Sequence, residues 1–299
     1  MNLPSPILHL VVLLIAGQSP QSPALTPRPA GIVVGNAGTY TVKRGDSLSS
    51  ISARLGIPRS TLARANGLRA DSWLRLGQRL LADNRHVVPA PREDGILINV
   101  PQMVLFYFET GTLVAWYPVA LGAPDWQTPL GTSHVATKET DPVWDVPVSI
   151  QEEMRRNGQK VRKKVAPGPA NPLGKFWMGL TPGSCGIHAT NAPASIYQFR
   201  SHGCIRLHSD DAADLFARVT IGTPVEIVYE PVLLARTEEG RLFLEVHPDV
   251  YDRAPDARET VRQLAERNGL TSAPDGDLVD REIRDCAGVA REIPMRGPV

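Results

Sequence analysis

The sequence predicts a mainly β domain over residues 95–229, preceded by a small α/β domain of order βααβ over 39–83 and followed by a mixed extension over 230–299. Most of the β domain consists of segments in which apolar and polar residues alternate, as in half-buried strands, and turn residues separate these segments. Helical spacing of apolar residues is scarce in the β domain before residue 209 and otherwise occurs in short segments of the other two parts. Stretches containing Pro, Ala and Gly, residues 25–38 and 84–94, are expected to be linkers.

The small domain is expected to run as a strand, two short helices and a closing strand. Leu48, Ile51 and Leu55 recur at helical spacing directly after Ser47, a residue type that often caps helices. About 45 residues are marginal but sufficient for a mini-domain. This segment should therefore fold as a separate module.

In the β domain, extended segments are predicted over residues 95–100, 103–108, 113–121, 132–138 and, as the last strand, 224–229. A single helix is expected over 209–219. The extension should add a hairpin, 232–235 with 241–247, and a helix from Asp256 to Gly269. No chemistry is assigned to this extension.

The N-terminus resembles an export signal. Its apolar stretch, residues 7–16, is too short to span a bilayer and is followed by Ser, Pro and Ala, although no Lys or Arg precedes it. We expect residues 1–24 to be a signal peptide and the mature protein to have no transmembrane span. The net charge is +1 with both signs mixed along the chain, which argues against a nucleic-acid binder and a polybasic membrane-surface protein.

One short run carries the candidate chemistry, Ser201-His202-Gly203-Cys204-Ile205-Arg206, with His188 sixteen residues before the cysteine. Amide-bond exchange needs a nucleophile, a base and donors for the oxyanion. Cys204 and His188 supply the first two, since a neighbouring histidine lowers the pKa of a thiol. Gly203 allows a substrate to approach backbone N–H groups closely.

The small domain resembles a LysM module. The matching residues are Tyr40 to Leu48, then Ile51, Leu62, Asn66 and Leu76 to Leu80. The resemblance implies binding of N-acetylglucosamine-containing glycans, and so of peptidoglycan strands. The residues it places in the glycan groove are Gly45, Asp46, Ser47, Leu48 and Asn66; each of them could equally be a turn or cap residue in any fold.

The β domain resembles the YkuD-type L,D-transpeptidases, a family with a β-sandwich-like fold. The resemblance rests on residues 186–188 and 201–206, with further matches at residues 128–131 and 138–144. It implies Cys204 as acyl-accepting nucleophile and His188 as general base, oriented by the backbone carbonyl of Ala189. Most members have Gly where this chain has Ala189. Ser201 and Arg206 would support the nucleophile loop and the substrate.

The resemblance also implies a reaction. Cys204 would form a thioester with a peptidoglycan tetrapeptide stem, release D-alanine, and pass the acyl group to an amine, either a diamino acid of another stem or the terminal Lys of an outer-membrane lipoprotein. No cofactor is required, and the periplasm is the expected location. Three alternatives remain: an L,D-carboxypeptidase, another thiol wall hydrolase, and a non-catalytic glycan-binding protein.

The remaining cysteine and histidine residues allow other interpretations. Cys185 and Cys286 are expected to be structural, and a disulfide between them is possible. His202 should be structural or substrate-facing, and His208 a surface or cap residue. A zinc site drawing on Cys185, His188, His202, Cys204 and His208 is disfavoured, because their spacings match no tight zinc pattern. No metal is therefore assigned.

Overall fold

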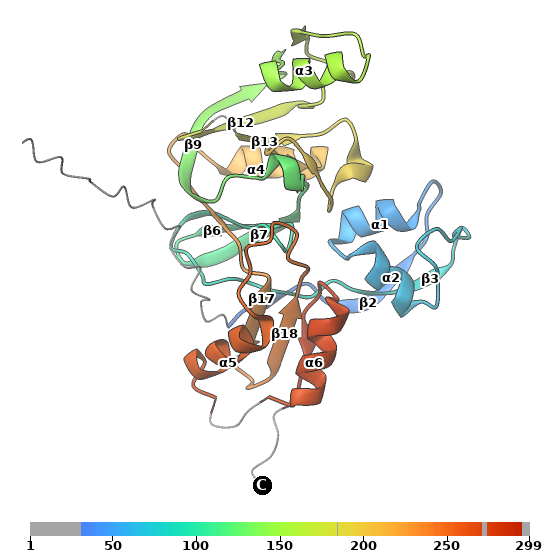
Figure 1. The fold of residues 1–299 in the computed structure, drawn as a ribbon, viewed down its shortest axis with the longest axis vertical. Coiled ribbons are helices and arrows are strands. Elements are labelled where there is room, and N and C mark those ends of the chain that lie inside the picture. Colours follow the sequence, from blue (N-terminus) through green and yellow to red (C-terminus); the bar gives the residue numbers. More distant parts are fainter. Residues whose placement is uncertain (1–30, 184, 271–273, 295–299) are drawn as a thin grey trace, which may run out of the picture.

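The computed structural model describes residues 31–183, 185–270 and 274–294, and it places three units side by side (Figure 1). The LysM-like module, in blue, lies against one side of the central β domain. The C-terminal extension, in orange to red, lies below the β domain and also contacts the module. The expected signal peptide, residues 1–24, lies outside the described residues.

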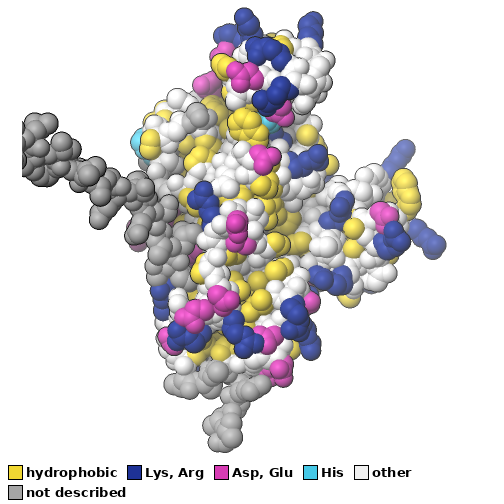
Figure 2. Space-filling view, viewed as in Figure 1, with side chains coloured by type: hydrophobic (Ala, Val, Ile, Leu, Met, Phe, Trp, Pro, Cys, Tyr) yellow, Lys and Arg dark blue, Asp and Glu magenta, His cyan; other side chains and the backbone are white. Residues whose placement is uncertain are grey.

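The module has the βααβ order that the sequence predicts. Strand β2 (Ala37–Thr41) pairs antiparallel with β3 (Arg79–Asp83), and α1 (Leu48–Leu55) and α2 (Arg59–Ala65) lie between them in sequence. Ser47 and Ser50 form a reciprocal capping box at the start of α1, which satisfies two backbone donors. Lys and Arg side chains stand out along the exposed edge of this module (Figure 2).

The two expected linkers are partly built into the fold. Strand β1 (Val33–Val34) pairs with β4 (His86–Val87), and both residues of β4 are fully buried. Within the expected linkers 25–38 and 84–94, residues 33–34 and 86–87 thus form a small sheet, and residues 25–30 lie outside the described residues. The overall composition of these segments gives no sign of such short pairs, because they become buried only when segments distant in the sequence come together.

The C-terminal extension forms its own small α/β unit. Strands β17 (Val232–Arg236), β18 (Leu242–Val246) and β19 (Arg291–Glu292) make one sheet, as the predicted hairpin requires. Helix α5 (Ala257–Arg267) begins after Asp256, whose side chain accepts from the Glu259 N–H. Helix α6 (Gly276–Asp285) was not predicted. The Thr61 hydroxyl of the module donates to the Ala287 carbonyl at 2.6 Å, so module and extension are in direct contact.

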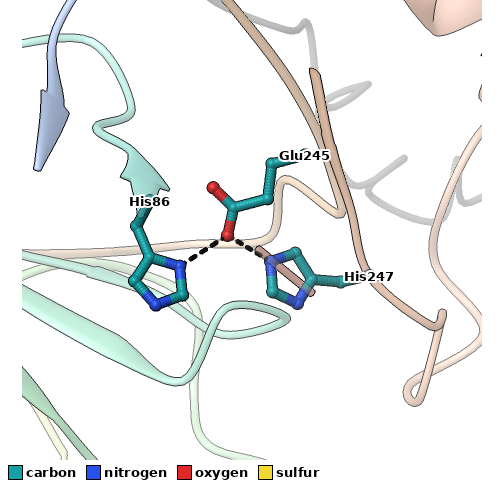
Figure 3. Close-up of side chains that lie close together, drawn as sticks. All are labelled: His86, Glu245 and His247. Atoms are coloured by element: carbon teal, nitrogen blue, oxygen red, sulfur yellow. Dashed lines mark hydrogen bonds and ion pairs between the residues drawn. The ribbon is translucent and has the colours of Figure 1, made fainter. Parts of the chain in front are cut away.

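A fully buried carboxylate joins the units. One oxygen of Glu245, in β18, lies 2.7 Å from Nδ1 of His86 and 2.7 Å from Nε2 of His247 (Figure 3). Its other oxygen accepts from the Val87 N–H and from the Gln102 amide. We call His86, Glu245 and His247 the Glu245 joint. Through this one carboxylate, the extension thus bonds both to β4, which precedes the β domain, and to Gln102 of the β domain.

The β domain is built on one eight-stranded mixed sheet, which confirms its mainly β character. Its strand order is β15 (Ile205–Leu207), β13 (Gly186–Ala189), β12 (Phe176–Thr181), β9 (Gly131–Thr140), β16 (Pro224–Val228), β5 (Gly95–Asn99), β6 (Val104–Glu109) and β7 (Thr112–Pro118). The strand expected to come last, β16, is central: it pairs antiparallel with β9 and parallel with β5. A short parallel pair, β8 (Leu121–Gly122) with β14 (Phe199–Ser201), lies beside the sheet.

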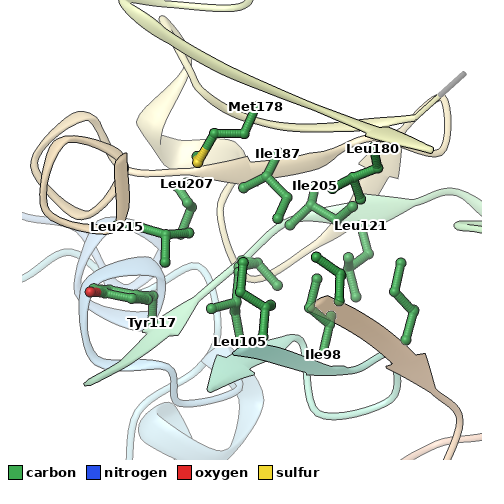
Figure 4. Close-up of a cluster of buried hydrophobic side chains, with 14 of the residues drawn as sticks. Ile98, Leu105, Tyr117, Leu121, Met178, Leu180, Ile187, Ile205, Leu207 and Leu215 are labelled. Atoms are coloured by element: carbon green, nitrogen blue, oxygen red, sulfur yellow. The ribbon is translucent and has the colours of Figure 1, made fainter. Parts of the chain in front are cut away.

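The two ends of this sheet face each other across a common core. Ile187 and Ile205 point from one end toward Leu105 from the other, and Leu215 of α4 (Ser209–Arg218) packs among them (Figure 4). Side chains alternate along a strand, so burying Ile187 and Ile205 turns their neighbours to the opposite face. One of those neighbours is His188.

A long excursion between β9 and β12 was not predicted. It contains β10 (Trp144–Asp145), α3 (Val148–Arg156) and β11 (Lys164–Val165) and rises above the sheet in Figure 1. We call residues 141–175 the α3 arm. Within the described ranges, no helix is long and apolar enough to cross a membrane.

Candidate active site

The nucleophile loop is fixed by two neighbouring strands and one buried serine. Cys204 directly precedes β15, which runs parallel to β13 with Arg206 opposite His188. The Ser201 hydroxyl donates to the Cys204 carbonyl at 2.5 Å and accepts from the Gly203 N–H at 3.2 Å. Gly203 has φ of 100°, a left-handed conformation that favours glycine. Ser201 therefore shapes the loop, and the Gly203 N–H donates to the Ser201 hydroxyl inside this loop.

His188 is buried and oriented by a backbone carbonyl. Its Nδ1 lies 2.5 Å from the Ala189 oxygen, so Nδ1–H is assigned as the donor and Nε2 is left as the group that can face the thiol. Trp177 packs beside the imidazole with ring centroids 5.8 Å apart. This is the orientation that the sequence analysis expected through Ala189.

The surroundings of Cys204 favour its thiolate form. A hydrogen bond from Cys185 is the largest influence, and hydrogen bonding and charge from His188 together with the Gly186 N–H also favour the anion. These contacts outweigh burial and lower the pKa of the Cys204 thiol well below its ordinary value. The same thiol–thiol hydrogen bond, with burial, raises the pKa of Cys185. Of the two neighbouring thiols, Cys204 is therefore the one whose surroundings favour the anion.

The assignment of Cys185 as merely structural misses this contact. Its Sγ lies 3.2 Å from the Gly203 carbonyl and beside the nucleophile, whereas Cys286 ends α6 with Sγ 3.2 Å from the Ile283 carbonyl. All three cysteines are free, so Cys185 and Cys286 are not joined. The position of Cys185, directly before β13 and three residues before His188, was the available sequence signal.

Ala189 fits at the position where the resemblance to YkuD-type enzymes implies glycine. It is a fully buried residue of β13, and its φ is not among the left-handed ones. Room for its methyl group comes from Gly174 of the α3 arm: a Cβ added to Gly174 would lie 2.7 Å from the Ala189 Cβ. The side chain is therefore accommodated by a compensating glycine.

Arg206 lies close to the nucleophile. Burial lowers the pKa of its guanidinium, and the negative charge of Cys204 opposes that shift. Its backbone N–H and carbonyl both bond to Ala120, which anchors β15. Arg206 thus adds positive charge near the thiolate.

His202 reaches the α3 arm. Its Nε2 lies 2.5 Å from a carboxylate oxygen of Glu153 on α3, and the Trp126 ring packs beside the imidazole at 5.0 Å. This contact connects the nucleophile loop to the arm above it. His208, in contrast, occupies the N-cap position of α4.

The structure does not gather the five residues considered for zinc. Among the described residues, the one group with metal-ligand spacing is the Glu245 joint, whose three ligand atoms lie within 4.8 Å of one another. Its shared oxygen already accepts from both rings, and the second nitrogen of His86 lies 2.8 Å from the Gly56 carbonyl. With acceptors at both ring nitrogens, His86 is an imidazolium, and the joint is satisfied as a buried ion pair.

The residues expected in a glycan groove serve the turns of the module. The Asp46 carboxylate accepts from the Tyr40 hydroxyl and the Lys43 N–H. Ser47 caps α1, Leu48 is buried, and the Asn66 amide bonds to the backbone of the module on both its nitrogen and its oxygen.

The same region exposes two side chains that the sequence analysis did not select. Gly45 has φ of 85° in an open turn, consistent with a turn role. Trp73 is 96% exposed and Leu76 is 75% exposed on the loop between α2 and β3. The sequence signal for this exposed pair was Trp73, a large apolar residue in a loop that the resemblance to a LysM module does not account for.

The fold and this Cys–His pair define a cysteine acyltransferase site, and comparison with known proteins names the family. A family model for the L,D-transpeptidase catalytic domain, YkuD, matches residues 93–227, and a LysM model matches residues 40–82. The chain is 32% identical to the probable L,D-transpeptidase ErfK/SrfK of Salmonella typhimurium, over 81% of this chain and 80% of the relative. It is 30% identical to the probable L,D-transpeptidase YbiS of Escherichia coli, over 97% and 98%.

Among solved structures, an L,D-transpeptidase from Mycobacterium smegmatis is similar at 22% identity, with 68% of this chain and all of that chain covered and a TM-score of 0.37. The relatives at 30% identity or more, which this chain covers almost fully, establish the family. The chain belongs to the YkuD-type L,D-transpeptidases and carries a LysM module.

Proposed function

We propose that this enzyme crosslinks or anchors peptidoglycan through a Cys204 thioester. The observation that carries the proposal is a buried His188 whose Nδ1 is bound to the Ala189 carbonyl, on a strand that pairs with the one directly after Cys204. His188 also lowers the pKa of the Cys204 thiol. That arrangement leaves Nε2 of His188 to move protons at the sulfur. The same arrangement holds an imidazole in the tautomer that nucleophilic cysteine catalysis requires.

The proposed reaction has two steps, acylation of Cys204 and transfer of the acyl group to an amine. Nε2 of His188 first takes the proton of the Cys204 thiol, which leaves a thiolate beside an imidazolium. The Cys204 sulfur then attacks the carbonyl carbon of the diamino acid in a tetrapeptide stem, and a C–S bond forms. The C–N bond to the terminal D-alanine then breaks, and the leaving amine takes a proton from His188. An acceptor amine next attacks the thioester, gives its proton to His188, and restores the Cys204 thiolate. Water in place of the amine gives carboxypeptidase activity.

Intact-mass measurements test the thioester. The enzyme is incubated with disaccharide tetrapeptide, and both free D-alanine and protein mass are followed. We expect D-alanine release and an acyl adduct mapped to Cys204, with both lost in Cys204→Ala and retained in Cys286→Ala. An adduct on another residue, or D-alanine release by Cys204→Ala at the original rate, would contradict the proposal.

The acceptor and the location are further parts of the proposal. We propose the periplasm as the location and two amines as acceptors, the diamino acid of another stem and the terminal Lys of an outer-membrane lipoprotein. Supplying each amine with the same donor distinguishes them by product mass. Hydrolysis alone with both amines present would support the carboxypeptidase alternative instead.

The LysM module is proposed to hold the enzyme on peptidoglycan strands. Co-sedimentation of the chain with isolated sacculi tests this, and the family match over residues 40–82 motivates it. We expect retention on sacculi that is unaffected by Cys204→Ala. A chain that stays in the supernatant would argue against the glycan-binding role.

A further inference from the structure

The positive charge of this protein is concentrated on the LysM module. Residues 39–83 contain eight Lys and Arg against three Asp, whereas the whole chain has a net charge of +1. The remainder of the chain is therefore net negative. The argument against a polybasic surface drawn from the average charge does not hold for this module.

The loop between α2 and β3 presents two apolar side chains to solvent. Trp73 is 96% exposed and Leu76 is 75% exposed, while Leu74 between them packs against the core of the module. An indole with nothing packed on either face is costly to leave in water, since burying such a ring is worth several kcal/mol at about 25 cal/mol per Å².

Two tight turns hold this loop in place. The Ser72 N–H donates to the Arg69 carbonyl at 3.0 Å, and the Gln78 N–H donates to the Arg75 carbonyl at 3.0 Å. The Gly77 N–H reaches the carbonyl of Val42, which precedes the first turn of the module. The exposed pair is thus presented on a structured loop. We call residues 69–79 the Trp73 tip.

Cations surround the tip. They are Lys43, Arg44, Arg69, Arg75 and Arg79, all exposed. Of the three arginines Arg44, Arg75 and Arg79, none forms an ion pair within the described part of the chain; Arg69 pairs with Asp71, and both side chains remain mostly in water. At the outer end of the module, Figure 2 shows a hydrophobic side chain with Lys and Arg on both sides.

We propose that the Trp73 tip docks on a bilayer surface that contains anionic phospholipids. Trp73 and Leu76 would enter the headgroup region, and the flanking cations would contact lipid phosphates. Tryptophan is favoured at that interface, and each nearby Lys or Arg strengthens attachment to an anionic membrane. The sugar units of a glycan strand carry no charge, and the carboxylates of its peptide stems offer no apolar phase for Trp73 and Leu76. An anionic bilayer offers both charge and an apolar phase, which favours the lipid as partner.

Vesicle co-sedimentation tests the proposal, using the chain from Gly31 onward, which holds every described helix and strand. The vesicles contain phosphatidylcholine alone or mixed with phosphatidylglycerol. We expect binding only to the mixed vesicles, weakened on the order of tenfold or more by Arg69→Gln/Arg75→Gln and similarly by Trp73→Ala/Leu76→Ala. Because all four side chains are exposed, melting temperatures should stay unchanged.

Matched controls come from surface positions outside the Trp73 tip. Arg281→Gln/Arg284→Gln on α6 removes the same charge, and Ile221→Ala removes an apolar side chain that is 68% exposed. Both should bind vesicles like the parent chain. Equal loss in the controls, or absence of phosphatidylglycerol-dependent binding, overturns the proposal. So does a loss of sacculus binding by the tip variants with vesicle binding retained, because the tip would then be a wall-binding surface.

Discussion

At the scale of single residues, the environment of Cys204 is more specific than a cysteine and a histidine in contact. The Cys185 thiol lies beside the nucleophile and donates to the Gly203 carbonyl at 3.2 Å, and Ser201 shapes the loop through the Cys204 carbonyl. Cys185, His188 and the Gly186 N–H each lower the pKa of the Cys204 thiol. All these contacts stabilise the anionic sulfur or its position. Removing one of them should therefore change reactivity without unfolding the domain.

The contribution of Cys185 can be measured directly. In Cys185→Ala the pKa of the Cys204 thiol should rise, because the hydrogen bond that lowers it most is gone. The pH midpoint for alkylation of Cys204 by iodoacetamide should shift upward, and the rate at neutral pH should fall several-fold. Cys286→Ala serves as the control and should leave the profile unchanged. An unshifted midpoint in Cys185→Ala would rule out this role.

The pairing of Ala189 with Gly174 gives a second test. Gly174 has φ of 63° and no space for a Cβ, so Gly174→Ala should lower stability by about 1–3 kcal/mol and reduce activity. Adding Ala189→Gly removes the clash but not the backbone strain, and should restore part of the loss. Thermal unfolding and turnover of the four variants in a double-mutant cycle measure the coupling. Strictly additive effects would show that the two sites do not interact.

At the scale of elements, the sequence predicts what local pattern controls. The capping serine of α1, the strands β5 and β6, and the hairpin of β17 and β18 all depend on neighbouring residues, and these predictions are confirmed. The half-buried alternation expected of β5 and β6 is wrong, because both faces of these strands are covered. The central place of β16 could not be predicted, because strand order depends on tertiary pairing rather than on the strand itself. The α3 arm was missed because α3 is short and mostly polar, with few apolar residues and none of them fully buried.

The candidate site divides in the same way. Cys204 and His188 could be selected because they lie in one short, characteristic sequence segment. Cys185, Gly174 and Glu153 could not, because each acts through a contact made only after β13, the nucleophile loop and the α3 arm come together. Asn66 was selected by resemblance, yet its amide is used inside the module.

Helix α3 is expected to be held against the nucleophile loop by the contact of Glu153 with His202. Glu153 bonds to His202 beside the nucleophile, while the exposed segment that follows α3 is rich in trypsin sites between Arg155 and Lys164. Glu153→Ala should therefore speed tryptic cleavage in this segment several-fold, with Glu152→Ala, an exposed neighbour, as the control. Gel or mass analysis of the fragments gives the rates. Equal rates in both variants would show that another contact holds the arm.

At the scale of the whole molecule, the Glu245 joint explains how three units keep one arrangement. His86 bonds to the Gly56 carbonyl at the end of α1 as well as to Glu245 of the extension. Gln102 of the β domain bonds to the same carboxylate. Breaking a buried ion pair by removing one partner costs about 3–5 kcal/mol, because the other charge is left uncompensated. The joint therefore ties the orientation of the LysM module to the integrity of the extension.

The joint also predicts how stability depends on pH. Burial opposes charge on both groups, but their mutual attraction and hydrogen bonds prevail, so the pKa of His86 is raised and the pKa of Glu245 is lowered to about 2. A raised histidine pKa stabilises the fold fully below its unfolded value of 6.5, and this contribution is lost as pH rises through the folded pKa. The Glu245 contribution is complete above its unfolded value of 4.5 and is lost toward pH 2.

The free energy of unfolding of the parent chain and of His86→Gln should therefore differ most between about pH 4.5 and 6.5. The difference should shrink at alkaline pH, because the parent then loses the His86 proton that the variant never carried. Urea unfolding at a series of pH values measures both curves, with His134→Gln, at an exposed position of β9, as the control. A difference that stays constant from pH 5 to strongly alkaline pH would mean that His86 acts through packing, and that the three units are not held together by its charge.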